Sequence, residues 1–202
     1  MIVQDAEIHR MQQAFRRLMD AFAHPGRVVE QPATPSCDVA SGLAAPLDTV
    51  VRLFVDQATT FHLSADAAAV RALADETRSK RAPVEQAAFC IVPASAGEEV
   101  AARTVRLACA GTPASPEKGA TAILECGRLS DGPEPGLACF EVEGPGVKDT
   151  TRFWADARLW AEARAVRGDE YPCGIEIVLV DAQGRMAAVP RSSTLRTVEG
   201  GR

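Results

Sequence analysis

The chain has 202 residues, of which 47% are hydrophobic and 24% are charged, a balance typical of a folded domain rather than a disordered segment. Its length suits one domain with a sizeable core. The formal net charge of −5 argues against a general nucleic-acid-binding protein, which would carry a basic excess. No stretch approaches the roughly 18 apolar residues that a membrane-spanning helix needs, and the first residues do not resemble a signal peptide.

The first predicted element is an amphipathic helix over residues 5–23, ended by the "HPG" of residues 24–26. Its apolar residues recur at spacings of three and four, which predicts one buried stripe. The members of this stripe are Ile8, Met11, Phe15, Leu18 and Phe22.

The rest of the chain alternates between short apolar runs and helical patterns. In chain order, strands are predicted over 27–31, 59–64, 85–92, 119–125 and 137–144, a hairpin over 174–180 and 185–190, and helices over 46–56, 65–80, 97–108 and 150–167. This order predicts an α/β fold: a single domain over 1–195 with one central mixed β-sheet flanked by helices. The glycine-rich end predicts a flexible tail over 196–202.

The segment "GTPASPEKGATAIL" (111–124) has the outline of a phosphate-binding loop but departs from its pattern. Pro116 stands where the second glycine belongs, Glu117 takes the lysine position, and Lys118 comes one residue late. Such a loop works through backbone N–H groups, and proline has none. We therefore expect no nucleotide loop here. Lys118 is also the one placed candidate for binding pyridoxal phosphate, although a solvated loop lysine is the favoured interpretation.

Metal and thiol chemistry have little support. The histidines at 9, 24 and 62 lack ligand spacing, so no metal site is predicted. Cys126 and Cys173 lie at strand ends and are possible nucleophiles, but nothing nearby would activate them, which favours buried packing. The cysteines show no CxxC spacing, and because the sequence shows no secretion signal, we expect reduced thiols in a cytoplasmic protein. They are Cys37, Cys90, Cys109, Cys126, Cys139 and Cys173.

Two groups of arginines are candidates for contacts with anions or with other chains. Arg191 follows Pro190 and precedes three hydroxyl residues, an arrangement that suits either an anion site or a buried ion pair. Arg16 and Arg17 lie on the polar flank of the first helix, where a solvated face or a subunit contact is favoured over a ligand site.

Four stretches taken together resemble one family, the H-type subunits of the bacterial phosphonate carbon–phosphorus lyase system. They follow the family's order from near the first residue to near Thr194. Tyr171 and Glu176 stand where the family commonly has phenylalanine and aspartate, and two serines replace two threonines after Arg191. The stretches are "FRRLMDAFAHPG" (15–26), "GTPASPEKGATAIL" (111–124), "EGPGV" (143–147) and "YPCGIEIVLVDAQGRMAAVPRSS" (171–193).

The resemblance implies a fold similar to the main domain of pyridoxal-phosphate-dependent transferases, without pyridoxal phosphate or another cofactor bound by this chain. It implies a homodimer that joins sibling subunits in a core complex. With ATP and a phosphonate as substrates, that complex would transfer the phosphonate to ribose C1 and release adenine, giving alpha-D-ribose 1-methylphosphonate 5-triphosphate. No catalytic residue can be transferred from the family. The candidate ligand contacts are Arg17, Glu117, Lys118, Glu176 and Arg191.

Three hypotheses stay open. The chain is an assembly subunit without chemistry of its own, or it contributes Arg191, Arg17 or Lys118 to a shared site for phosphonate or triphosphate. Alternatively it is a stand-alone small-molecule-binding protein or transferase with its own anion site. The predicted helix over 150–167, with Trp154 and Trp160, is the expected dimer face.

Overall fold

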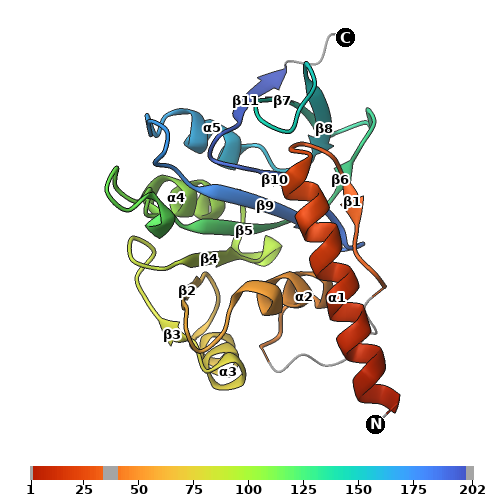
Figure 1. Ribbon diagram of the computed structural model, residues 1–202, viewed down its shortest axis with the longest axis vertical. Coiled ribbons are helices and arrows are strands. Elements are labelled where there is room, and N and C mark those ends of the chain that lie inside the picture. Colours follow the sequence, from red (N-terminus) through yellow and green to blue (C-terminus); the bar gives the residue numbers. More distant parts are fainter. Residues whose placement is uncertain (1, 34–40, 199–202) are drawn as a thin grey trace.

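The computed structural model describes residues 2–33 and 41–198, which form two β-sheets covered by helices (Figure 1). The helices are α1 (Ile2–Ala23), α2 (Ala45–Phe54), α3 (Ala67–Thr77), α4 (Glu98–Leu107) and α5 (Leu159–Ala165), with 3₁₀ turns η1 (Ala94–Ala96) and η2 (Pro116–Lys118). The strands are β1 (Val29–Glu30), β2 (Thr60–Leu63), β3 (Lys80–Arg81), β4 (Phe89–Val92), β5 (Thr121–Cys126), β6 (Leu129–Ser130), β7 (Ala138–Glu143), β8 (Thr151–Ala155), β9 (Glu176–Asp181), β10 (Arg185–Val189) and β11 (Thr194–Val198).

The larger sheet is mixed and has seven strands in the order β1-β10-β9-β5-β4-β2-β3. Strands β3, β2, β4, β5 and β9 are parallel, whereas β10 and β1 add on as antiparallel strands. Residues 182–184 connect β9 to β10, so the predicted hairpin is confirmed. The predicted α/β fold with a central mixed sheet is therefore confirmed.

Both faces of this sheet are buried because its central strands alternate their side chains between two cores. Ile123 and Val178 pack with α1, α2 and α3 on one face. Leu124 and Ile177 pack on the other face with α4, α5 and the second sheet. Burial on both sides explains why these strands read as continuous apolar runs rather than as alternating patterns.

The second sheet, with the order β11-β7-β8-β6, corrects the prediction for residues 150–167. It is antiparallel and lies at the opposite end of the molecule from α3 (Figure 1). The helix predicted over 150–167 is wrong: its first part is β8, which pairs with β7, and a loop separates β8 from the short α5. Phe153 and Ala155 alternate inward along β8, and the Phe153 ring stacks on Phe140 with centroids 5.2 Å apart.

The expected dimer face depended on that helix, so this prediction is wrong too. Trp160, at the start of α5, is 1% exposed and belongs to the core, and its indole N–H donates to the Ala157 carbonyl at 3.0 Å. Trp154 lies on β8 instead of on a helix. The start of α5 is held by α4, because the Glu98 carboxylate accepts from the backbone N–H groups of Arg158 and Leu159.

The predicted flexible tail begins too early. Strand β11 runs to Val198 and pairs with β7, from Thr194 opposite Glu143 to Val198 opposite Cys139. Residues 196–198 are therefore part of the second sheet. Residues 199–202 and Cys37 lie outside the described part of the chain.

Helix α1 packs on the sheet with a narrower stripe than its apolar spacing predicts. Ala14, Leu18 and Ala21 are buried against the sheet. By contrast, Ile8 is 51% exposed and Phe15 is 50% exposed. The helix therefore leaves apolar side chains at the surface.

Candidate functional site

The segment 111–124 forms a tight loop and then a strand. Thr112 and Ser115 pair across a turn, Pro116–Lys118 forms η2, and β5 follows directly. A phosphate loop would lead into a helix whose N-terminus faces the anion. The prediction that a strand follows this loop is confirmed, and the geometry of a nucleotide loop is absent from this described segment.

Arg191 and Glu176 meet at the edge of the large sheet where β5 and β9 begin and β10 ends. The Arg191 Nε lies 2.5 Å from Glu176 Oε1, and the Arg191 backbone N–H donates to Glu176 Oε2 at 2.8 Å. Arg191 Nη1 also donates to the Pro116 carbonyl. We call Arg191, Glu176 and the Pro116 carbonyl the Arg191 clamp. It ties the loop 111–119 to the start of β9 and to the residues after β10, so the ion-pair interpretation of Arg191 is the one that the structure supports.

Two glycines allow this close packing. A Cβ atom on Gly119 would lie 2.4 Å from the Gly174 carbonyl oxygen and 2.8 Å from Arg191 Nη1. The Gly174 N–H donates to the Ala110 carbonyl at 2.8 Å, and Gly174 has φ of 135°, a conformation that side chains rarely adopt. The segment that carries much of the family resemblance is thus explained by backbone packing around the clamp.

The other candidate residues lie elsewhere. Glu117 and Lys118 are exposed in η2. Arg17 is exposed on α1 and lines a separate hollow with Asp20 and Glu30. The structure therefore brings together Glu176 and Arg191, and leaves Arg17, Glu117 and Lys118 outside their contact.

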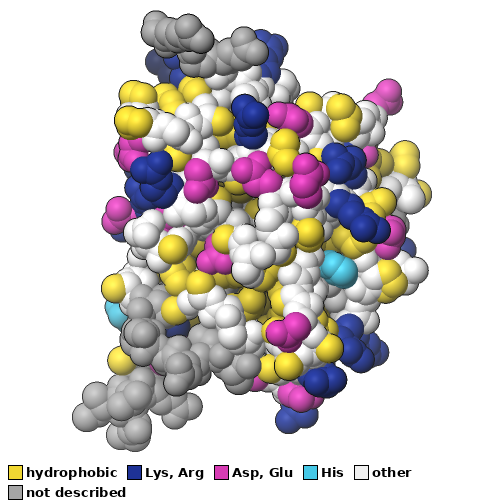
Figure 2. Space-filling view, turned by 180° about the vertical axis from the view of Figure 1, so that it is seen from behind, with side chains coloured by type: hydrophobic (Ala, Val, Ile, Leu, Met, Phe, Trp, Pro, Cys, Tyr) yellow, Lys and Arg dark blue, Asp and Glu magenta, His cyan; other side chains and the backbone are white. Residues whose placement is uncertain are grey.

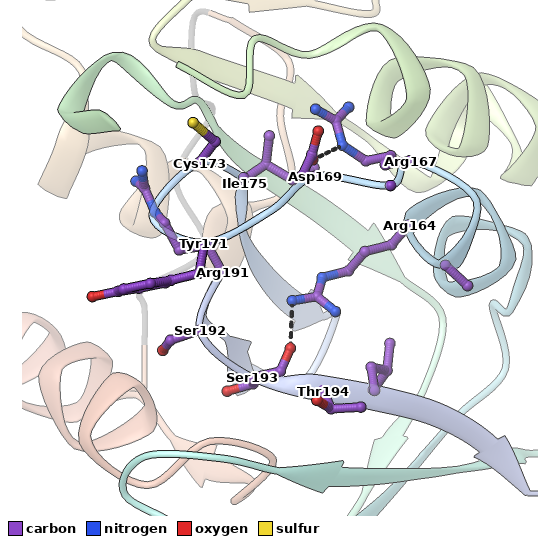
Figure 3. A pocket seen from close by; sticks show the side chains of 14 residues that line it. Arg164, Arg167, Asp169, Tyr171, Cys173, Ile175, Arg191, Ser192, Ser193 and Thr194 are labelled. Carbon is purple, nitrogen blue, oxygen red and sulfur yellow. Dashed lines mark hydrogen bonds and ion pairs between the residues drawn. The ribbon is translucent and has the colours of Figure 1, made fainter. Parts of the chain in front are cut away.

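A cavity of about 460 Å³ lies beside the clamp and holds two arginines that sequence analysis did not identify as site residues (Figure 3). Arg167 Nε lies 2.5 Å from Asp169 Oδ2, and its Nη2 donates to the Ala108 carbonyl at 2.9 Å. Arg164 Nη2 donates to the carbonyls of Pro190 and Ser193, both at 2.9 Å. Both arginines fall inside the wrongly predicted helix over 150–167, and nothing in their spacing marks them as site residues.

A second hollow, of about 320 Å³, lies at the carboxyl ends of β4 and β5. Ligands of open α/β sheets commonly bind at this edge. The carboxylates in this hollow accept hydrogen bonds from backbone N–H groups. Glu125 accepts from the Ala94 N–H at 2.9 Å and Asp156 from the Gly127 N–H at 3.1 Å. Glu98 accepts from the two N–H groups at the start of α5. Among the described residues, no group of three or more His, Cys, Asp or Glu side chains is placed to hold a metal ion.

The thiols offer no activated nucleophile in this hollow. Cys126 is buried at its floor, where burial raises the pKa of its thiol, and the Sγ donates to the Val180 carbonyl at 3.6 Å. Burial also raises the pKa of Cys90 to about 12. All five described cysteines are free. Cys173 is half-buried and lines the cavity that holds Arg164 and Arg167, which we call the arginine cavity.

The surface drawn in Figure 2 mixes acidic and basic side chains of the described residues instead of gathering one sign. A nucleic-acid-binding face would show a concentrated basic area. None of the helices in the described ranges has the length and apolar character needed to cross a membrane.

Comparison with known proteins identifies a family and a similar protein. The family model for "Bacterial phosphonate metabolism protein (PhnH)" matches residues 4–196, which is nearly the whole chain. A protein from Stutzerimonas stutzeri named "Putative C-P lyase subunit protein HtxG" is 30% identical over 190 residues, covering 91% of this chain and 85% of that protein.

Proposed function

The chain belongs to the bacterial phosphonate metabolism protein (PhnH) family, and from this membership we propose that it is a subunit of a carbon–phosphorus lyase core complex. The observation that carries the proposal is the family match over residues 4–196 together with the name of the Stutzerimonas relative. The assembled complex would transfer a phosphonate to ribose C1 of ATP and release adenine, with alpha-D-ribose 1-methylphosphonate 5-triphosphate as the product.

Within that complex, we assign the chain an assembly role. Two residues that were candidates for chemistry have structural contacts instead. Arg191 is bonded within its clamp, and Cys126 is buried in the core. Lys118 is exposed in η2. A Schiff-base lysine would need a pocket that holds the rest of the cofactor, so the proposal includes no pyridoxal phosphate. The free thiols of the described cysteines fit the cytoplasmic location that the proposal includes.

The surface of α1 suits contact with another chain. Ile8, Met11 and Phe15 line an open apolar hollow together with Leu53 of α2. Apolar side chains gathered at a surface in this way are typical of protein–protein interfaces. We propose that a partner chain of the complex covers this α1 face, and that the chain also forms a homodimer.

Co-purification tests the proposal. The tagged chain should bring down its sibling subunits from the cells that make them, and size-exclusion chromatography with light scattering should give the mass of a dimer for the purified chain. Phe15→Glu places a charge in the α1 hollow and should weaken capture by about tenfold or more, as for the loss of a central interface side chain. Gln13→Glu, at an exposed position of the same helix, is the matched control. Capture of no sibling subunit would overturn the assembly role.

One observation favours a second candidate function, a binding protein or transferase with its own anion site. Arg164 lies in a cavity and has no carboxylate partner within ion-pair distance among the described residues. A cation in such a position suits a small anionic ligand.

A further inference from the structure

The arginine cavity is built from segments that are distant in sequence. Its walls are the end of α5, the loop that leads to β9, and the residues between β10 and β11. Figure 3 shows Arg164 extending from α5 into the middle of the lining side chains, whereas the guanidinium of Arg191 points away from it. Arg164 is therefore the cation that the cavity presents at its centre.

The three arginines differ in what balances their charge. Arg167 is paired with Asp169, and Arg191 is paired with Glu176. For Arg164, the described residues supply two backbone carbonyls at 2.9 Å and no carboxylate at ion-pair distance. These five side chains carry three positive and two negative charges, which leaves one positive charge on Arg164.

Burial makes that unbalanced charge costly. Desolvation lowers the pKa of Arg164, and the carboxylates of Glu176 and Asp169 act in the opposite direction from a distance. A guanidinium in such a place gains when an anion supplies the missing charge-assisted hydrogen bonds. Only Nη2 of its donors has a partner among the described residues, so Nε and Nη1 remain to bind an anion.

The remaining lining defines what kind of anion fits. Ser192 and Thr194 place hydroxyl groups on the cavity wall, and Tyr171 stands at its edge with 76% of its surface exposed. A guanidinium fork with neighbouring hydroxyls matches the several oxygens of a tetrahedral oxyanion. A volume of about 460 Å³ also leaves room for an organic substituent.

We propose that this cavity binds a phosphonate or phosphate monoester group. Arg164 would be the central binding residue, and the hydroxyl groups of Ser192 and Thr194 would donate further hydrogen bonds. The chemistry comes from the cavity and does not depend on the assembly role. Phosphonates and phosphate monoesters both carry the tetrahedral oxyanion that the site would recognise.

The test is titration of the purified full-length chain with methylphosphonate, inorganic phosphate and acetate, followed by isothermal calorimetry and by ³¹P line broadening for the two phosphorus compounds. The expected result is saturable 1:1 binding of methylphosphonate or phosphate that is at least about tenfold tighter than binding of acetate. The tighter of the two phosphorus compounds identifies the source. Equal affinity for acetate, or no saturation, would overturn the proposal.

Variants place the anion in the cavity. Ser192→Asp adds a negative charge at an exposed lining position, and should weaken binding at least about tenfold while the chain stays folded. Thr197→Asp makes the same charge change at an exposed position of β11 outside the lining, and should leave binding unchanged. Arg164→Lys keeps the charge but loses the fork, and should weaken binding too. Equal binding by Ser192→Asp and Thr197→Asp would contradict the site, whatever sibling subunits the chain captures.

Discussion

Replacing Arg191 with alanine tests whether this residue serves structure or chemistry. In Arg191→Ala the Glu176 carboxylate loses its Nε donor and the Pro116 carbonyl loses its Nη1 donor, while the backbone N–H of residue 191 can still donate to Glu176. The two side chains are only 17% and 19% exposed, so water replaces the lost donors incompletely.

The expected loss of unfolding free energy follows from these contacts. A charge-assisted hydrogen bond is worth about 1.5–3 kcal/mol. The Pro116 carbonyl still accepts from the Gly119 N–H at 3.0 Å, so losing its second donor adds about 1 kcal/mol or less. Removing one partner of a fully buried pair costs about 3–5 kcal/mol, and the residual exposure here places the value near the lower end, at about 3 kcal/mol.

Urea denaturation followed by circular dichroism measures this loss. Arg196→Ala is the matched control, because Arg196 is 65% exposed and lies 4.0 Å from Glu143, so its loss should change stability by about 0.5 kcal/mol or less. A stability of Arg191→Ala equal to that of Arg196→Ala would refute the clamp. If the complex assembled normally with the variant but lost turnover, Arg191 would belong to the chemistry.

Three further predictions concern the core, the acid range and the thiols. Phe153→Ala should lower the unfolding free energy by about 3–5 kcal/mol in urea, because the ring is buried against Phe140; a loss under about 1 kcal/mol would contradict the described β8 packing. Burial raises the pKa of Asp48, so the folded chain keeps that proton to higher pH than the unfolded chain, and the stability that Asp48 contributes falls as pH rises through the carboxyl range. The urea midpoint of Asp48→Asn should therefore rise relative to the unchanged chain between about pH 3 and about pH 6, and a falling difference would show the opposite shift. Cys90, with its pKa raised to about 12, should resist a thiol reagent in the folded chain at about pH 8 and react in urea, as followed by peptide mass spectrometry; labelling as fast as that of the half-buried Cys173 would contradict its burial.

Most of the large sheet was predictable because its strands are buried on both faces and read as apolar runs such as residues 119–125. Strand β8 was not, since its five residues precede an alanine- and arginine-rich stretch with high helix propensity. What makes residues 151–155 a strand is pairing with β7, a contact between distant segments. Strand β11 shows the same limit: three of the five residues in its sequence "TLRTV" are polar, and it forms a strand because it pairs with β7.

In the candidate site, too, some residues could be predicted from the sequence, but the contacts between them could not. Arg191 was identified from its local context and Glu176 from the family resemblance, but their pairing depends on β9 and β10 lying side by side. Arg164 could not be identified, because its role depends on carbonyls at Pro190 and Ser193 and on the absence of a carboxylate partner among the described residues. Such an arrangement has no spacing signature in the sequence.

Adenine release from ATP in the presence of a phosphonate is the measurement that tests the central claim most directly. The purified lone chain and the chain captured with its sibling subunits should be assayed side by side by chromatography. The proposed subunit role predicts adenine from the assembly and none from the lone chain. Adenine produced by the lone chain would contradict that role and make the chain an enzyme in its own right.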